Sequence, residues 1–185
     1  MQKRVELYND GIGVVEYVDH MGSDLTIVNS ARVSFGKHRD SLDEKDEKLI
    51  KYLVNHKHTS TFEHNVVTFR FVVPLYIRSQ HHRHRTWSYN EISRRYTDLD
   101  MRFYEPETFR TQHKSNRQAS NAEELANPEI GYSPHILLGY PKSSAAEAIQ
   151  HHHEHSLKLF NSLIEAGVCR EQARGVLPQN LYTEY

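Results

Sequence analysis

The chain has 185 residues, 37% of them hydrophobic, and its 23 lysines and arginines nearly balance its 24 aspartates and glutamates, giving a formal net charge of −1. This length predicts one domain with a modest core, and the balanced charge argues against an extended basic track for nucleic acid. Cys169 is the sole cysteine, so no intrachain disulfide can form. Because there is also no apolar run of membrane-spanning length and no signal-peptide core, we expect a cytoplasmic protein.

The first half of the chain alternates between predicted strands and helices. Residues 14–18 have the alternation of a strand, and residues 24–34 have one apolar face, as in a helix. Ser41 begins a capping signal for a second helix. Residues 66–73 form the clearest strand, rich in β-branched and aromatic side chains and ended by Pro74. Pro74 suits the first turn of a further helix that continues toward residue 85.

The second half contains a polar stretch and then more helix. Residues 113–134 are rich in Ser, Asn, Gln and Gly with little periodicity, which predicts a long polar loop. Ser144 and Glu147 match a capping box, and the helix that follows is expected to end near Gly167. A short helix is predicted at 170–176. Without an internal repeat or domain boundary, residues 1–185 are predicted to form a single mixed α and β domain.

The segment 83–96 carries the strongest functional signal. Four arginines and a histidine share it with one carboxylate, Glu91, and with Trp87, Tyr89 and several hydroxyls and amides. So many positive charges need a partner, and a planar phosphorylated anion held by arginine forks is the natural one. A solvated helix face and a site for single-stranded nucleic acid are the alternatives. We interpret the segment as a nucleotide site and expect no nucleic acid.

This segment resembles the signature of the flavin-dependent thymidylate synthases, the alternative thymidylate synthase family. Arg83-His84-Arg85 is followed by seven residues and then by Ser93, a long and specific pattern. Similar segments occur on both sides, and the resemblance covers nearly the whole chain from about residue 10 onward. The flanking segments that carry it are 31–35, 56–64, 103–120, 173–178 and 180–183.

The resemblance implies an enzyme that converts dUMP to dTMP. A methylene group from methylenetetrahydrofolate goes to uracil C5 and is reduced by a hydride passed from NADPH through FAD. The implied fold is α+β, a single mixed domain with a central, mostly antiparallel sheet flanked by helices. The implied assembly is a homotetramer whose sites are shared between subunits. The eleven tyrosines and fourteen histidines agree with an oligomer, because they supply amphipathic surface for subunit contacts.

The resemblance also implies roles for individual residues. Catalytic candidates stabilise the charge that develops on the uracil ring; Ser93 has no adjacent base that would make it a nucleophile. These candidates are Arg83, Ser93 and Arg95. The expected FAD contacts are His58, Ser60, Arg83, His84, Arg85 and Glu91. The expected dUMP contacts are Gln80, His81, His82, Arg83, Glu91, Ile92, Ser93, Arg94, Arg95 and Arg174.

The chain departs from the family pattern in three places. His81-His82 stands where the family usually has aromatic or apolar residues, and Arg94 stands where many members have a small one. The sequence stops at Tyr185, whereas family members continue with a segment that adds FAD contacts and a further arginine at the uracil. Three hypotheses follow: a separate chain supplies that segment, the chain is a truncated form, or the protein is a catalytically silent nucleotide-binding subunit.

A run of histidines raises the question of a metal site. His151 and His155 would lie one turn apart on a helix and could share a metal ion. No third ligand follows in a recognisable spacing, and the same holds for His81, His82 and His84. We therefore interpret both groups as solvent-exposed or interface histidines and expect no metal.

Overall fold

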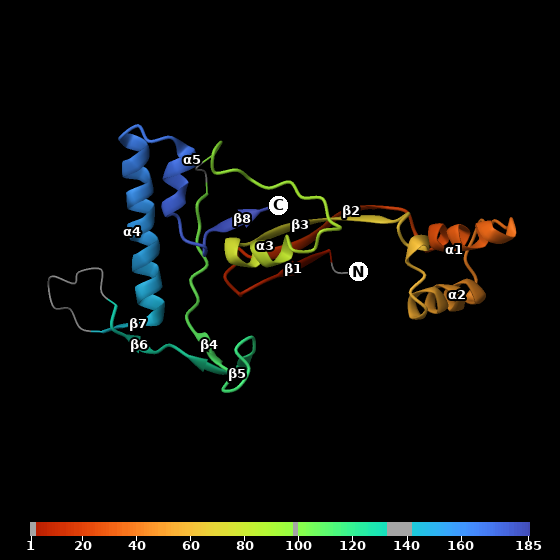
Figure 1. Cartoon of the computed structure of the whole chain (residues 1–185), viewed down its shortest axis with the longest axis horizontal. Coiled ribbons are helices and arrows are strands. Elements are labelled where there is room, and N and C mark those ends of the chain that lie inside the picture. Colours follow the sequence, from red (N-terminus) through yellow and green to blue (C-terminus); the bar gives the residue numbers. More distant parts are fainter. Residues whose placement is uncertain (1–2, 98–99, 133–141) are drawn as a thin grey trace. The chain divides into compact units, whose positions relative to one another are not determined.

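A computed structural model describes residues 3–97, 100–132 and 142–185 (Figure 1). The chain divides into two compact units. The first contains Met1–Leu7 and Val14–Phe71, and the second contains Tyr8–Gly13 and Val72–Tyr185. Each is described by itself below.

The first unit combines strands with two helices. Strand β1 (Arg4–Glu6) pairs antiparallel with β2 (Val14–Met21), in the register Arg4↔Glu16. The predicted strand at 14–18 is therefore confirmed and extends to Met21. Helices α1 (Asp24–Arg32) and α2 (Glu44–Asn55) follow. The 3₁₀ helix Val33–Phe35 continues α1 directly, and the 3₁₀ helix Thr59–Thr61 is separated from the end of α2 by three residues. Apolar side chains from three elements are buried in this unit: Val14, Ile27, Val28 and Leu53.

Helix α2 begins two residues later than the sequence predicted, because Asp43 and not Ser41 caps it. The Asp43 carboxylate accepts hydrogen bonds from the amides of Lys45 and Asp46 at 2.8 and 3.0 Å. Asp46 in turn accepts from the Asp43 amide at 3.2 Å, so the two aspartates form a capping box. The Asp43 carboxylate is suited to these helical amides, because it is negatively charged and the helix N-terminus is positive.

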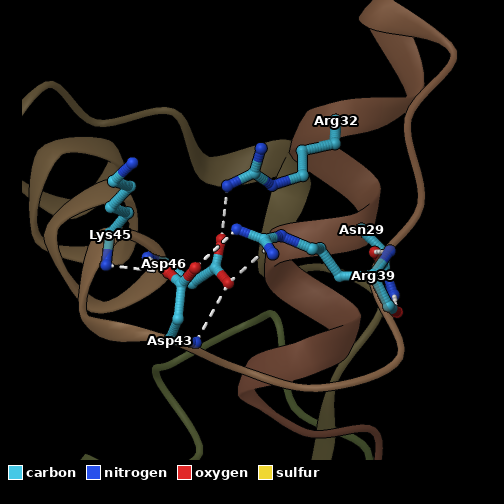
Figure 2. Close-up of polar contacts among 6 residues, drawn as sticks. All are labelled: Asn29, Arg32, Arg39, Asp43, Lys45 and Asp46. Atoms are coloured by element: carbon cyan, nitrogen blue, oxygen red, sulfur yellow. Dashed lines mark hydrogen bonds and ion pairs between the residues drawn. The ribbon is translucent and has the colours of Figure 1, made fainter.

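Buried charge links α1 to α2 (Figure 2). Asp46 is fully buried and accepts a hydrogen bond from Arg32, and Arg39 lies 3.6 Å from its second oxygen. Arg39 also pairs with Asp43 at 2.6 Å, and its backbone exchanges two hydrogen bonds with the Asn29 amide. This network fixes the connection between the two helices.

The second unit contains the end of the longest strand. Strand β3 (Val66–Pro74) starts in the first unit, and its last three residues pair antiparallel with β8 (Tyr182–Glu184), with Val73 opposite Thr183. The four-stranded sheet has the order β1-β2-β3-β8. With antiparallel pairs in each of its described sheets and helices α1 to α5 beside them, the chain has the predicted α+β fold.

The described residues of the second unit include the α-helices α3, α4 and α5. Helix α3 (Leu75–His81) follows β3 directly, with Pro74 as its N-cap. Helix α4 (Ala145–Glu165) begins with the predicted Ser144 and Glu147 capping box and lies beside α5 (Arg170–Ala173), which a 3₁₀ turn extends (Figure 1). The core of this unit gathers residues from α4, α5 and the approach to β8: Phe160, Ala173, Leu177 and Leu181. None of the helices described is long and apolar enough to cross a bilayer.

The predicted polar loop at 113–134 is interrupted by strands at Ser120–Ala126 and Glu129–Ile130, and the prediction is wrong for these two segments. Strand β4 (Phe109–Gln112) pairs with β5 (Ser120–Ala126), and β6 (Glu129–Ile130) pairs with β7 (Ser143–Ser144). Side-chain bonds rather than apolar packing join the first pair: Thr111 donates to Glu124 at 2.7 Å and receives from Asn121 at 2.9 Å. Polar side chains leave no alternation for a sequence pattern to detect. Residues 133 and 134 lie outside the described part.

Candidate nucleotide site

A pocket of about 340 Å³ lies in the second unit. This volume falls in the range of pockets that enclose small organic ligands. Its walls come from α3, the segment 91–94, the 3₁₀ turn after α5, and β8 with the residues before it. The lining residues are Leu75, Arg78, Glu91, Ile92, Ser93, Arg94, Arg174, Leu177, Leu181, Tyr182 and Thr183.

Two neighbouring side chains of the pocket, Arg78 and Thr183, hold Glu91 in place. Arg78 holds it with a two-pronged contact, Nε to Oε1 at 2.8 Å and Nη2 to Oε2 at 2.8 Å. The Thr183 hydroxyl donates to Oε1 at 2.6 Å. Parallel bonds from a guanidinium to a carboxylate are among the strongest and most directional that side chains make.

Strand β8 carries the neighbouring wall of the pocket. The Ile92 amide donates to the Glu184 carbonyl at 2.9 Å, and Arg94 Nη2 lies 3.4 Å from the Tyr182 carbonyl. Beyond it the chain turns, since the Ser93 carbonyl accepts from the Tyr96 amide at 3.0 Å. These bonds fix residues 91–94 along the edge of β8 although their sequence has no strand pattern.

The charge in the pocket is mainly positive. Arg78, Arg94 and Arg174 line it, with Glu91 as the one carboxylate among the lining residues. Arg78 is already paired with Glu91, whereas the Arg174 guanidinium makes no hydrogen bond or ion pair to any part of the chain that is described. An unpaired guanidinium in a pocket is suited to a phosphate.

The pocket unites half of the residues predicted to contact a nucleotide. Five of the ten line it: Glu91, Ile92, Ser93, Arg94 and Arg174. The other five do not: Gln80, His81, His82, Arg83 and Arg95. Gln80 is exposed on α3. The Arg95 guanidinium lies 3.4 Å from a carboxylate oxygen of Glu171, and the next residue, Tyr96, is mostly exposed. Within one copy of the chain, the predicted contacts therefore form two groups.

His81 and His82 belong to an aromatic cluster beside the pocket. His81 Nδ1 lies 2.7 Å from the Tyr185 hydroxyl, and the His82 ring lies 4.0 Å from that of Tyr89. Burial, together with neighbouring positive charge, lowers the pKa of both histidines, and burial raises the pKa of Tyr185 to about 12. The Nε2 atom of His82 is buried without a hydrogen-bond partner. These groups are neutral at neutral pH.

The remaining predicted flavin contacts are exposed. Arg83, His84 and Arg85 follow the end of α3 in a turn, where the Tyr89 hydroxyl donates to the His84 carbonyl at 2.8 Å. The guanidinium groups of Arg83 and Arg85 have no partner within the described residues. His58 and Ser60 are exposed in the first unit, around its second 3₁₀ helix.

Comparison with known proteins identifies the family. The family model for "Thymidylate synthase complementing protein" matches residues 16–185. The chain belongs to the flavin-dependent thymidylate synthase family. It is 44% identical over 173 residues to the flavin-dependent thymidylate synthase of Thermus thermophilus and 40% identical over 174 residues to that of Thermosipho melanesiensis, each match covering 94% of this chain. The chain spans 58% and 69% of the lengths of these relatives.

Solved structures agree with this family assignment. The chain is similar to a UMP/dUMP methylase PolB from Streptomyces cacaoi bound with 5-Br UMP, with a TM-score of 0.68 and 31% identity over 92% of this chain and 68% of that one. A second structure of PolB, bound with 5-Br dUMP, gives a TM-score of 0.66 and 32% identity over 97% of this chain and 72% of that one.

The sequence did not predict three polar residues that line the pocket of this family member: Arg78, Tyr182 and Thr183. Arg78 lies outside the Arg-His-Arg pattern, and Thr183 reaches the pocket only because β8 pairs with β3. An arginine one turn before a recognised motif, on the same predicted helix, is the signal that would have found the first.

The histidine run on α4 is divided between two environments. His153 is buried, whereas His151, His152 and His155 are exposed. Across residues 3–97, 100–132 and 142–185, no three His, Cys, Asp or Glu side chains are grouped so that they could hold a metal ion.

Proposed function

We propose that this chain binds dUMP in the pocket of the second unit and acts as the dUMP-methylating part of a flavin-dependent thymidylate synthase. The observation that carries the proposal is the gathering of Glu91, Ser93, Arg94 and Arg174, distant in sequence, around one positively charged pocket. The two PolB structures support it, because a chain of similar fold is bound there with brominated UMP and dUMP.

The Arg174 guanidinium, which has no partner among the described residues, is suited to the phosphate, and Ser93 adds a neutral hydroxyl donor to the pocket lining. Arg83, Ser93 and Arg95 are the proposed catalytic residues, which would stabilise negative charge on the uracil carbonyls as C5 is modified. Arg83 and Arg95 do not line the pocket within one chain. We propose that they reach a nucleotide in an oligomer.

A flavin fits the exposed turn after α3 by the chemistry of its donors. Arg83 and Arg85 present two guanidinium groups that no described residue pairs with, which suits them to a pyrophosphate, and His84 lies between them in the sequence. With His58, Ser60 and Glu91 they would hold FAD. The flavin would supply the hydride, drawn from NADPH, that reduces the carbon unit given by methylenetetrahydrofolate. The residues of this chain bind and orient these molecules.

The proposed assembly is a homotetramer. Apolar side chains stand exposed in the first unit, among them Met21 at 64%, Val33 at 72% and Phe35 at 77%. Surfaces of this kind typically contact another chain. Light scattering after size-exclusion chromatography tests this, with four copies expected; a monomer at micromolar concentration would contradict it.

The purified chain tests the proposed activity directly. We expect FAD to bind, as followed by quenching of its fluorescence, and NADPH oxidation to depend on dUMP and methylenetetrahydrofolate with dTMP as product. Binding of dUMP without turnover would favour the silent nucleotide-binding subunit. Affinity for oligonucleotides that falls steeply with salt, without dUMP binding, would favour the nucleic-acid module.

Replacing Arg174 tests the phosphate site. We expect Arg174→Ala to weaken dUMP binding by about 10- to 150-fold, the loss of a charged hydrogen bond worth 1.5–3 kcal/mol. Isothermal titration calorimetry measures it. Arg117→Ala is the matched control, because Arg117 is an exposed arginine in the same unit that does not line the pocket. Equal affinity in both variants would remove Arg174 from the site.

A further inference from the structure

The hydrogen bonds of Glu91 determine what it can offer a ligand in the pocket. An ionised carboxylate accepts hydrogen bonds and donates none, with about four acceptor positions on its two oxygens. Among the residues that the structure describes, Oε1 accepts from Arg78 and from Thr183, whereas Oε2 accepts from Arg78 alone. Glu91 can therefore accept a further hydrogen bond from a donor group of a ligand. It repels a fully ionised phosphate, which is negatively charged and has no hydrogen-bond donor.

We propose that Arg78 and Thr183 are positioning residues that hold Glu91 as a hydrogen-bond acceptor for the nucleoside part of the nucleotide. This inference rests on the proposed function. The donors available on that part of dUMP are the sugar hydroxyl and the uracil N–H, and either is suited to a fixed carboxylate. The phosphate then lies toward Arg174, the lining arginine whose guanidinium is unpaired within the residues described.

The fold gives Arg78 and Thr183 fixed positions around Glu91. Thr183 is 4% exposed and pairs with Val73 of β3. Arg78 stands one turn into α3, which follows β3 without a loop and is tied to the residues before β8 by a hydrogen bond from the Leu75 amide to the Leu181 carbonyl at 3.0 Å. The positions of Arg78 and Thr183 are therefore both fixed by β3, and the bonds that they donate leave the Glu91 side chain little freedom to rotate.

The charge of Arg78 is neutralised by this pairing. Nε and Nη2 of its guanidinium face the Glu91 oxygens at 2.8 Å, so the Glu91 carboxylate offsets the positive charge that would otherwise attract a phosphate. Removing Arg78 should therefore act on ligand binding through Glu91. An arginine that contacts the phosphate directly would behave differently, and this difference can be measured.

The test compares dUMP with deoxyuridine, which lacks the phosphate, in a double-mutant cycle. Dissociation constants are measured by calorimetry for the wild-type chain, Arg78→Gln, Glu91→Gln and the double variant. We expect Arg78→Gln to weaken both ligands by the same factor, about tenfold or more. The double variant should bind no more weakly than Glu91→Gln alone, because Arg78 has no role once the carboxylate is gone. Arg174→Ala should weaken dUMP and leave deoxyuridine unchanged.

Two results would overturn the inference. One is an Arg78→Gln loss confined to dUMP, which would mean a direct phosphate contact; the other is a double variant whose loss is the sum of the two single losses. Thr183→Val, which keeps the side-chain shape, and Arg78→Lys, which keeps the charge, should give smaller losses shared by both ligands. If thermal melting shows that Arg78→Gln is unfolded, Thr183→Val and Arg78→Lys replace it in the comparison of dUMP with deoxyuridine. A wild-type chain that binds neither ligand would instead overturn the proposed function itself.

Discussion

At the scale of single residues, the buried His153 links the chain's stability to pH. Its side chain is 2% exposed, stacks on Phe103 with ring centroids 4.6 Å apart, and has Nδ1 3.0 Å from a Glu105 oxygen. Burial lowers its pKa below the ordinary value of 6.5, an effect that Glu105 opposes and His152 adds to. The folded chain therefore holds fewer protons than the unfolded chain at mildly acidic pH.

The sign of the pH effect follows from this difference. Stability from the neutral His153 is fully present above pH 6.5 and is lost as the pH falls below it, because the unfolded chain then gains the proton more readily. We expect urea unfolding to give a lower free energy at pH 5.5 than at pH 7.5. His153→Gln should reduce that difference, although His81 and His82 act in the same direction. An unchanged pH dependence in the variant would contradict this account.

At the scale of elements, local chemistry decides where helices begin. The Asp43 side chain accepts hydrogen bonds from two helical amides, and Ser41 lies outside α2. We expect Asp43→Ala to cost about 1 kcal/mol of unfolding free energy, the usual loss for an N-cap. Its bond to Arg39 is lost as well.

Ser41→Ala is the control for the cap, with an expected change within about 0.5 kcal/mol. Chemical denaturation of both variants measures the difference. Equal destabilisation would mean that the cap lies at Ser41, as the sequence pattern predicted, and would contradict the hydrogen bonds seen at Asp43.

The elements also indicate what the sequence could predict. Strand β3 and helix α4 have strong local signals, a β-branched run and a capping box, and both are confirmed. The polar hairpin of β4 and β5 has none, because cross-strand side-chain bonds hold it together. The contact between Thr183 and Glu91 joins residues 92 positions apart, and no local pattern encodes such a distance.

At the scale of the whole molecule, the family and the pocket support one another. The recognised motif provides Glu91, Ser93 and Arg94, and the pairing of β8 with β3 completes the pocket around them. His58 and Ser60 lie in the first unit, whereas Arg83 to Arg85 lie in the second. Each unit thus carries some of the residues for which the resemblance implies a role in FAD binding.

The most direct test of the central claim is the position of a bound nucleotide. We would locate 5-bromo-dUMP in crystals of this chain from the anomalous scattering of bromine, which marks uracil C5. The account predicts the bromine in the pocket lined by Arg78, Glu91 and Thr183, with the phosphate within hydrogen-bond distance of Arg174. A nucleotide bound at the exposed turn of Arg83 to Arg85, with the pocket empty, would contradict it.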